Sequence, residues 1–129
     1  MNAPALRIEP LGLAKRDGDG WRTTWRITNS ESDAVRLIGA IAPHSQFRGE
    51  TSLDREICGN GNTQVSLVVT TAGVTGSEIE NAFVILLVEQ DEQRWRLLAR
   101  LHVALEDAGR PRLRIEAVTT QRVDFSGEL

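Results

Sequence analysis

Bulky apolar and polar side chains alternate along most of this chain, with a period of two residues rather than the 3.6 of a helix. Residues 21–28 show the pattern best, because two tryptophans, a threonine and an isoleucine alternate there with arginine and threonine. Successive side chains of a strand point to opposite faces, so the pattern predicts a strand with one buried face. Aromatic and β-branched residues also favour strands.

The same alternation predicts strands at 35–42, 64–71, 82–88, 94–106 and 112–120. Residues 6–15 predict an edge strand, because Pro10 cannot donate a ladder hydrogen bond. The polar segment 46–56 predicts only a short, irregular strand. Turn-forming residues separate the segments at 17–20, 29–33, 89–93 and 107–111, which favours hairpins between neighbouring antiparallel strands.

Seven to eight short strands without an amphipathic helix predict an all-β antiparallel sandwich. In strand count, length and spacing the chain resembles immunoglobulin-like and fibronectin-III-like domains over nearly its whole length. The resemblance implies a fold and no function, because the paired cysteines and the tyrosine of such domains are missing. With 129 residues, we expect one domain spanning 1–129.

Charge and cysteine content restrict the partners and the compartment. A net charge of -3 supplies no positive field for phosphates, so nucleic acid is not expected as a partner. Cys58 is the only cysteine and excludes an intramolecular disulfide. No stretch approaches the roughly 18 apolar residues of a membrane helix, and the first residues lack a signal-peptide pattern. We therefore expect a cytoplasmic protein without a membrane partner.

Motifs with catalytic or metal chemistry have plainer interpretations. Residues 17–20 have aspartates two apart but lack the closing glutamate of a calcium loop, so they predict a hairpin turn. The glycine-rich residues 58–62 lead into a strand rather than the helix of a phosphate loop. His44 and His102 lack the surroundings of a catalytic base. We predict no catalytic residue, metal or cofactor, and we do not expect an enzyme.

The three tryptophans alternate in phase with other apolar residues, which indicates core packing rather than a stacking platform for ligands. We expect core positions for Trp25, Trp95, Leu97 and Phe83, and also for Trp21 near its strand end.

Basic side chains gather on one face of the strand at 94–106. The candidate anion-binding residues are Arg94, Arg96, Arg100 and His102. The alternative, which we favour, is a solvated face paired with Glu80, Glu106 and Glu116.

The segment 82–88 is apolar on both alternating faces, so the core alone does not explain it. If Phe83, Ile85 and Leu87 point inward, the other face joins a neighbouring strand at 35–42 to form an apolar patch edged by arginines. Such a patch indicates an interface. The candidate interface residues are Ile38, Ala40, Ala42, Val84, Leu86, Val88, Leu98, Arg96 and Arg100. The alternative is a cover formed by residues 121–129, with Val123 and Phe125.

These features predict a non-catalytic protein-interaction module. It would associate with itself, most simply as a homodimer, or bind a protein partner as a small accessory subunit of a larger bacterial-type assembly. The alternative is a protein that binds a small anion, or an enzyme that uses the arginine-lined strand face.

Overall fold

The chain folds as one antiparallel sheet of eight strands. A computed structural model describes residues 3–123 of the 129. The strands are β1 (Leu6–Asp17), β2 (Gly20–Asn29), β3 (Val35–His44), β4 (Phe47–Ile57), β5 (Asn62–Thr71), β6 (Glu78–Gln90), β7 (Gln93–Leu105) and β8 (Pro111–Arg122). Over the described residues the only helical element is a 3-10 turn, Asp107–Gly109. The all-β antiparallel prediction is confirmed, and β4 is a full strand rather than a short one.

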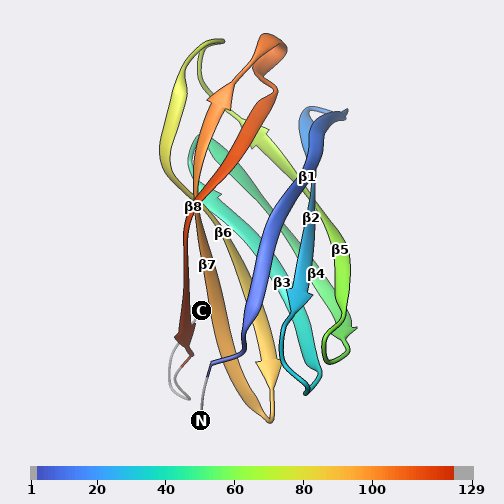
Figure 1. The fold of residues 1–129 in the computed structure, drawn as a ribbon. Helices are drawn as coiled ribbons and strands as arrows, with labels where there is room; N and C mark the ends of the chain where they lie inside the picture. The colour runs from blue at the N-terminus through green and yellow to red at the C-terminus, as the bar shows by residue number, and fades with distance from the viewer. Residues whose placement is uncertain (1–2, 124–129) are drawn as a thin grey trace.

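The sheet curls on itself until its two ends meet. Its strand order is β1-β2-β5-β4-β3-β6-β7-β8. Figure 1 shows the resulting elongated shape, with β7 and β8 on the left and β4 and β5 on the right. The two end strands, β1 and β8, contact each other, but within residues 3–123 no ladder of hydrogen bonds joins them. The architecture is therefore barrel-like, and an immunoglobulin-like sandwich is not established by it.

The three strands expected to form the apolar surface are neighbours. β3 pairs with β6, and β6 pairs with β7 along most of its length. The β6–β7 hairpin closes through Asp91 and Glu92, both with positive φ, between the paired Gln90 and Gln93. Two positive-φ residues in a two-residue loop give the turn whose twist matches that of the strands.

A single hydrophobic core fills the interior, and its tryptophans are where the alternation predicts them. Trp21, Trp25, Trp95 and Leu97 are all buried. The indole Nε1 of Trp25 donates a hydrogen bond to Thr23 Oγ1 at 2.8 Å, and that hydroxyl donates to the Leu67 carbonyl at 2.7 Å. This buried chain ties β2 to β5 through side chains as well as through the ladder.

The inward and outward faces of β6 are the reverse of the prediction. The hairpin register pairs Val84 with Ala99, Leu86 with Leu97 and Val88 with Trp95. Directly paired residues of an antiparallel sheet share a face, so the even-numbered residues of β6 join the buried residues of β7. Val84, Leu86 and Val88 are at most 1 % exposed, whereas Phe83 is only half-buried and points outward.

A β-bulge causes a second difference, in β3. The register with β6 shifts there, because Leu37 and Gly39 pair with the consecutive residues Val88 and Leu87, which leaves Ile38 as an extra residue. An extra residue reverses the alternation beyond it. Leu37 and Ala40 consequently both point inward, and Ile41, expected on the Leu37 side, lies outside.

Two adjacent leucines test the observed faces of β6. Leu86→Ala should lower the free energy of unfolding by about 2–5 kcal/mol, because it empties core volume. Leu87→Ala should lower it by less than about 1 kcal/mol, because this side chain is half-buried on the outer face. Urea unfolding of both variants measures the difference. Equal losses, or a larger loss for Leu87→Ala, would contradict the observed orientation.

The buried hydrogen-bond chain gives a second prediction. Thr23→Val leaves the Trp25 indole N–H without its acceptor inside the core, at a cost of about 1–3 kcal/mol. Thr24→Val is the control, because its side chain faces outward on the same strand. Thermal and urea unfolding should separate the two variants, and similar stabilities would show that the hydrogen bond contributes nothing.

Candidate functional site

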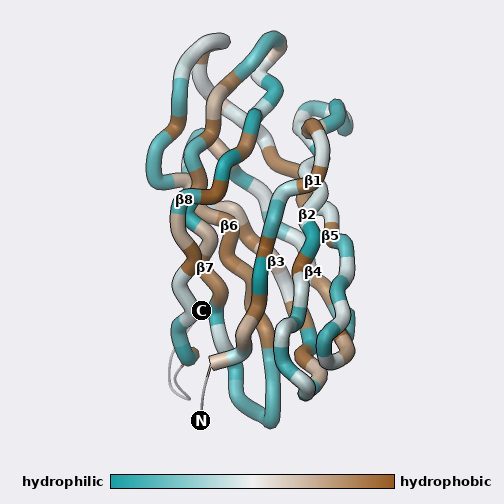
Figure 2. Tube along the Cα trace, in the orientation of Figure 1, coloured by the Kyte–Doolittle hydropathy of each residue, from teal (hydrophilic) through white to brown (hydrophobic). Residues whose placement is uncertain are grey.

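The outer face of β3, β6 and β7 carries a group of apolar side chains that the core does not use. Ile41 is 38 % exposed, and the others are half-buried on the surface. We call this group the outer patch, which consists of Ile38, Ile41, Phe83, Ile85, Leu87 and Leu98. Figure 2 shows that β6 and β7 are hydrophobic over much of their length. Outward apolar residues on three adjacent strands form a contiguous surface.

A groove of about 500 Å³ lies within the outer patch. Ile38, Ile41, Ile85 and Leu87 contribute its apolar walls. Gly39 lies between them and is paired with Leu87 on β6, so the sheet has no outward side chain at that point. The groove is therefore apolar and open to solvent, with room for a side chain from another molecule.

Arg96 and Glu50 border the groove on its two sides, from β7 and from β4. Within residues 3–123, neither Arg96 nor Arg100 forms an ion pair. The Nε atom of Arg96 is buried and has no hydrogen-bond partner among those residues. A buried donor without a partner costs free energy.

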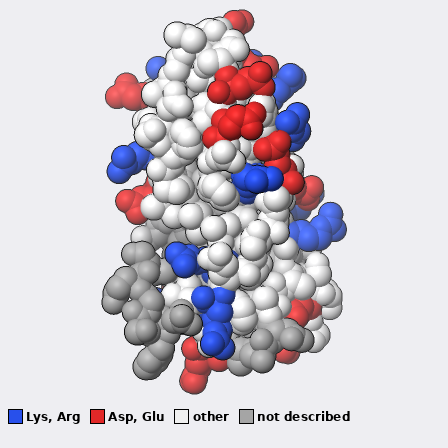
Figure 3. Space-filling view, turned by 90° about the vertical axis from the view of Figure 1, so that its left-hand side faces the viewer, with Lys and Arg blue, Asp and Glu red and all other residues white. Residues whose placement is uncertain are grey.

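Exposed ion pairs lie at the Gln90–Gln93 end of the outer patch. The Nε atom of Arg94 lies 3.4 Å from a carboxylate oxygen of Glu89, and Arg36 pairs with Asp54. Figure 3 shows one side of the molecule, on which acidic and basic groups are mixed in the upper half and uncharged surface separates them from basic groups lower down. Exposed pairs of this kind contribute little stability, about 0–1 kcal/mol each, and can exchange partners.

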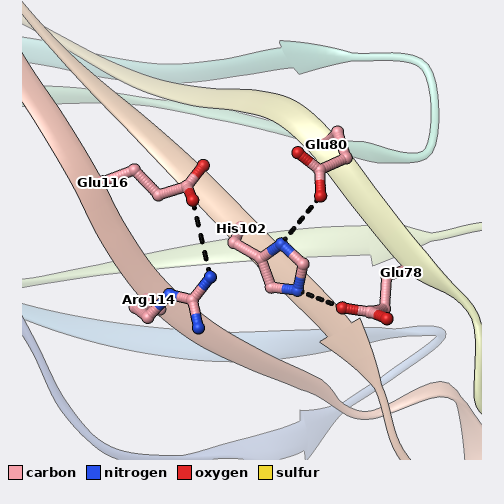
Figure 4. Close-up of polar contacts among 5 residues, drawn as sticks. All are labelled: Glu78, Glu80, His102, Arg114 and Glu116. Atoms are coloured by element: carbon pink, nitrogen blue, oxygen red, sulfur yellow. Dashed lines mark hydrogen bonds and ion pairs between the residues drawn. The ribbon is translucent and has the colours of Figure 1, made fainter.

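His102 lies at the other end of β7, between two glutamates (Figure 4). Its Nε2 atom contacts the Glu78 carboxylate, and its Nδ1 atom lies 3.2 Å from Glu80 Oε1. The carboxylates meet opposite ring nitrogens, so the three groups do not converge on one point as metal ligands would. Over residues 3–123 no cluster of three potential ligands suits a metal ion.

The four candidate anion-binding residues occupy successive outward positions of β7, with Leu98 among them. Arg94 and His102, at the two ends of this row, already have acidic partners, and Arg96 and Arg100 lie between them. On β8, Arg112 pairs with Glu106 and Arg114 with Glu116. Of the three glutamates expected as partners, Glu80 contacts His102, whereas Glu106 and Glu116 pair with arginines outside β7. The solvated face and the binding of an anion both stay predictions.

The structure divides the candidate interface residues between two faces. Ile38, Leu98, Arg96 and Arg100 lie on the outer surface as expected. The inward-pointing members are wrongly assigned, because the hairpin register and the β3 bulge turn them into the core: Ala40, Ala42, Val84, Leu86 and Val88. Their neighbours in the chain, which include Ile41, Ile85 and Leu87, take their place in the outer patch.

The remaining motifs have structural roles. Residues 17–20 form the β1–β2 turn, in which Gly18 has a φ of 58°. His44 Nδ1 accepts a hydrogen bond from the Gln46 amide at 3.0 Å, within the β3–β4 turn. Cys58 is an exposed free thiol at the end of β4.

The proposed cover falls largely outside the described residues. Phe125 and the chain around it lie beyond residue 123. Gln121 and Arg122 belong to β8, and Val123 is buried, with its amide donating to the Arg94 carbonyl at 2.9 Å.

Comparison with protein-family models, with curated proteins and with solved structures finds no match to this chain. Among residues 3–123, no helix has the length and apolar character needed to cross a bilayer. Inference about function therefore starts from the chain's own surface.

An apolar dye tests whether the outer patch is accessible. Anilinonaphthalene sulfonate combines aromatic rings with an anionic group, so it suits an apolar groove bordered by Arg96. The dilute protein should enhance its fluorescence, and Ile85→Glu should remove most of the enhancement. Ser66→Glu, on the exposed face of β5, is the matched control. Equal effects of the two variants, or no enhancement by the wild type, would contradict an accessible patch.

Proposed function

We propose that this chain is a non-catalytic protein-interaction module that binds its partner through the outer patch. The partner is a second copy of the chain or another protein, for which this chain serves as a small accessory subunit. The observation that carries the proposal is the apolar outer face of β6, on a strand whose inner face already completes the core.

The contrast between β6 and β4, which lies on the other side of β3, supports this function. The outward side chains of β4 are polar or charged, as expected of a sheet face that meets only water. β6 instead presents Phe83, Ile85 and Leu87. Contiguous apolar surface on a soluble domain is typical of protein-binding sites. The groove adds a depression into which a partner's side chain would fit.

The arrangement of ionisable groups favours binding over catalysis. Within residues 3–123 they lie mainly as separate pairs on the outside of the sheet, such as Arg22 with Asp17 and Arg36 with Asp54. A catalytic site needs several such groups that converge in a cleft. A small-anion site at Arg96 and Arg100 is the alternative, and an anionic partner segment would use the same two guanidinium groups.

The strand order also supports an immunoglobulin-like relationship. β1, β2 and β5 are neighbours in one half of the sheet, and β3, β6 and β7 in the other. These groupings match the two sheets of an immunoglobulin-like sandwich, with β4 joining them here. We extend the proposal to such a sandwich derivative, working in the cytoplasm, where a lone exposed thiol such as Cys58 stays reduced.

Site-specific photo-cross-linking tests the function. The photoreactive amino acid p-benzoyl-phenylalanine, in place of Leu87 or of Leu98, should give a discrete adduct when irradiated in a homogenate of the producing cells. The adduct has either twice the mass of the chain or the mass of the chain plus one other protein. The same amino acid in place of Ser66 should give no adduct, because that position is exposed on β5, outside the outer patch. If positions 87 and 98 also give none, the outer patch does not bind protein.

A further inference from the structure

Strand pairing arranges the outward residues of β4, β3, β6 and β7 in level rows that cross the outer patch. The first row contains Glu56, Arg36, Glu89 and Arg94, in strand order. The second contains Ser52, Gly39, Leu87 and Arg96. The third contains Glu50, Ile41, Ile85 and Leu98. Charge occupies one end of the patch, and apolar side chains occupy its middle.

The first row has a property that a general binding surface does not need. Its charges alternate as acidic, basic, acidic and basic across the four strands. Reading the row backwards exchanges every charge for its opposite. A face with this property is complementary to its own copy when the order of the strands is reversed between the two.

A two-fold axis in the plane of the interface produces that reversal. When the axis runs parallel to the strands, between β3 and β6, each row faces the same row of the partner in reverse order. Within the roughly 30° crossing angle of packed sheets, β4 then lies over the partner's β7, and β3 over the partner's β6. A contact of this kind is isologous and closes after two copies.

The same operation matches the apolar rows. Leu87 faces the partner's Gly39, where the groove leaves space for it. Ile41 faces the partner's Ile85, and Glu50 faces the partner's Leu98. The two residues that flank Leu98 on the outer face of β7 are Arg96 and Arg100, so Glu50 gains two guanidinium groups within reach. Among the outward arginines of β7, these are the two that form no ion pair within residues 3–123.

We propose that the occupant of the outer patch is a second copy of this chain, packed about a two-fold axis parallel to the strands between β3 and β6. This inference rests on the proposed function and identifies the partner. Leu87 and the groove over Gly39 provide the apolar contact, and the alternating charges of the first row determine its register.

The size of the patch indicates a weak dimer. Four strands at a spacing of about 4.8 Å, over three or four rows, give a plan area of at most about 400 Å² per protomer, because the sheet is curled. That area is below the range of stable specific interfaces and suits a transient contact. We therefore expect a reversible dimer, with a dissociation constant on the order of 1–100 μM.

Sedimentation equilibrium of the whole chain, with charge-reversal variants, tests the arrangement. Leu87→Glu should weaken the dimer by at least about 100-fold, because it places a carboxylate in an apolar contact. Glu56→Arg and Arg94→Glu should each weaken it by about 3–10-fold, and the double variant should recover most of the loss. Ser66→Glu should leave it unchanged. Leu87→Ser serves as a second variant if Leu87→Glu does not fold, as judged by circular dichroism.

Each outcome separates this inference from the proposed function. The inference and the proposed function are both supported if Leu87→Glu disrupts the dimer and if the double charge reversal recovers the affinity that each single reversal loses. A dimer that Leu87→Glu leaves intact overturns the arrangement, because association then uses another surface. If the wild type stays monomeric at about 1 mM, the occupant of the outer patch is not a second copy of the chain. In that case an adduct of position 87 with a different protein still supports the interaction module, and the absence of any adduct overturns both.

Discussion

The pairing of β6 with β7 determines what the rest of this molecule presents inside and outside. β6 is apolar on both faces, so hydrophobicity alone does not select the side that enters the core. The choice is made by the two-residue turn at Asp91 and Glu92, which aligns Leu86 with Leu97 and Val88 with Trp95. Because β7 is apolar on one face and mostly charged on the other, the face of β6 that is paired with the apolar face of β7 turns inward. The other face of β6, with Phe83, Ile85 and Leu87, stays outside and forms the centre of the outer patch.

Period-two alternation predicted most of the fold from the sequence. The strands at 21–28, 35–42 and 94–106 agree with β2, β3 and β7 to within a few residues, because each combines one apolar face with polar turns at its ends. β4 was underestimated, since its outer face is polar and few of its inward side chains are large. Whether eight strands separate into two sheets or close into one depends on pairing between distant segments, above all the short β4–β5 ladder. Local patterns do not contain that information.

The candidate surface was predicted in kind but not in its residues. An excess of apolar residues at 82–88 correctly indicated an apolar outer face on β6. The sequence does not show which face of β6 is inward, because Asp91 and Glu92 are unusual residues at positive φ and do not mark a two-residue loop. Such a loop aligns Val88 with Trp95 and places Leu87 outside. The bulge at Ile38 has one weak sequence signal, Gly39, because a glycine inside a strand often marks a bulge.

The contact between β1 and β8 has a consequence for how this protein avoids uncontrolled assembly. A sheet with two free edges invites further strands, and an apolar face beside such edges is a hazard for fibril growth. Here each edge lies against the other, Pro10 interrupts the donors of β1, and a register shift after Leu11 distorts its outer half. Growth along the hydrogen-bonding direction is thereby restricted. The chain keeps an apolar outer face while limiting the edges through which contact between copies would become polymerisation.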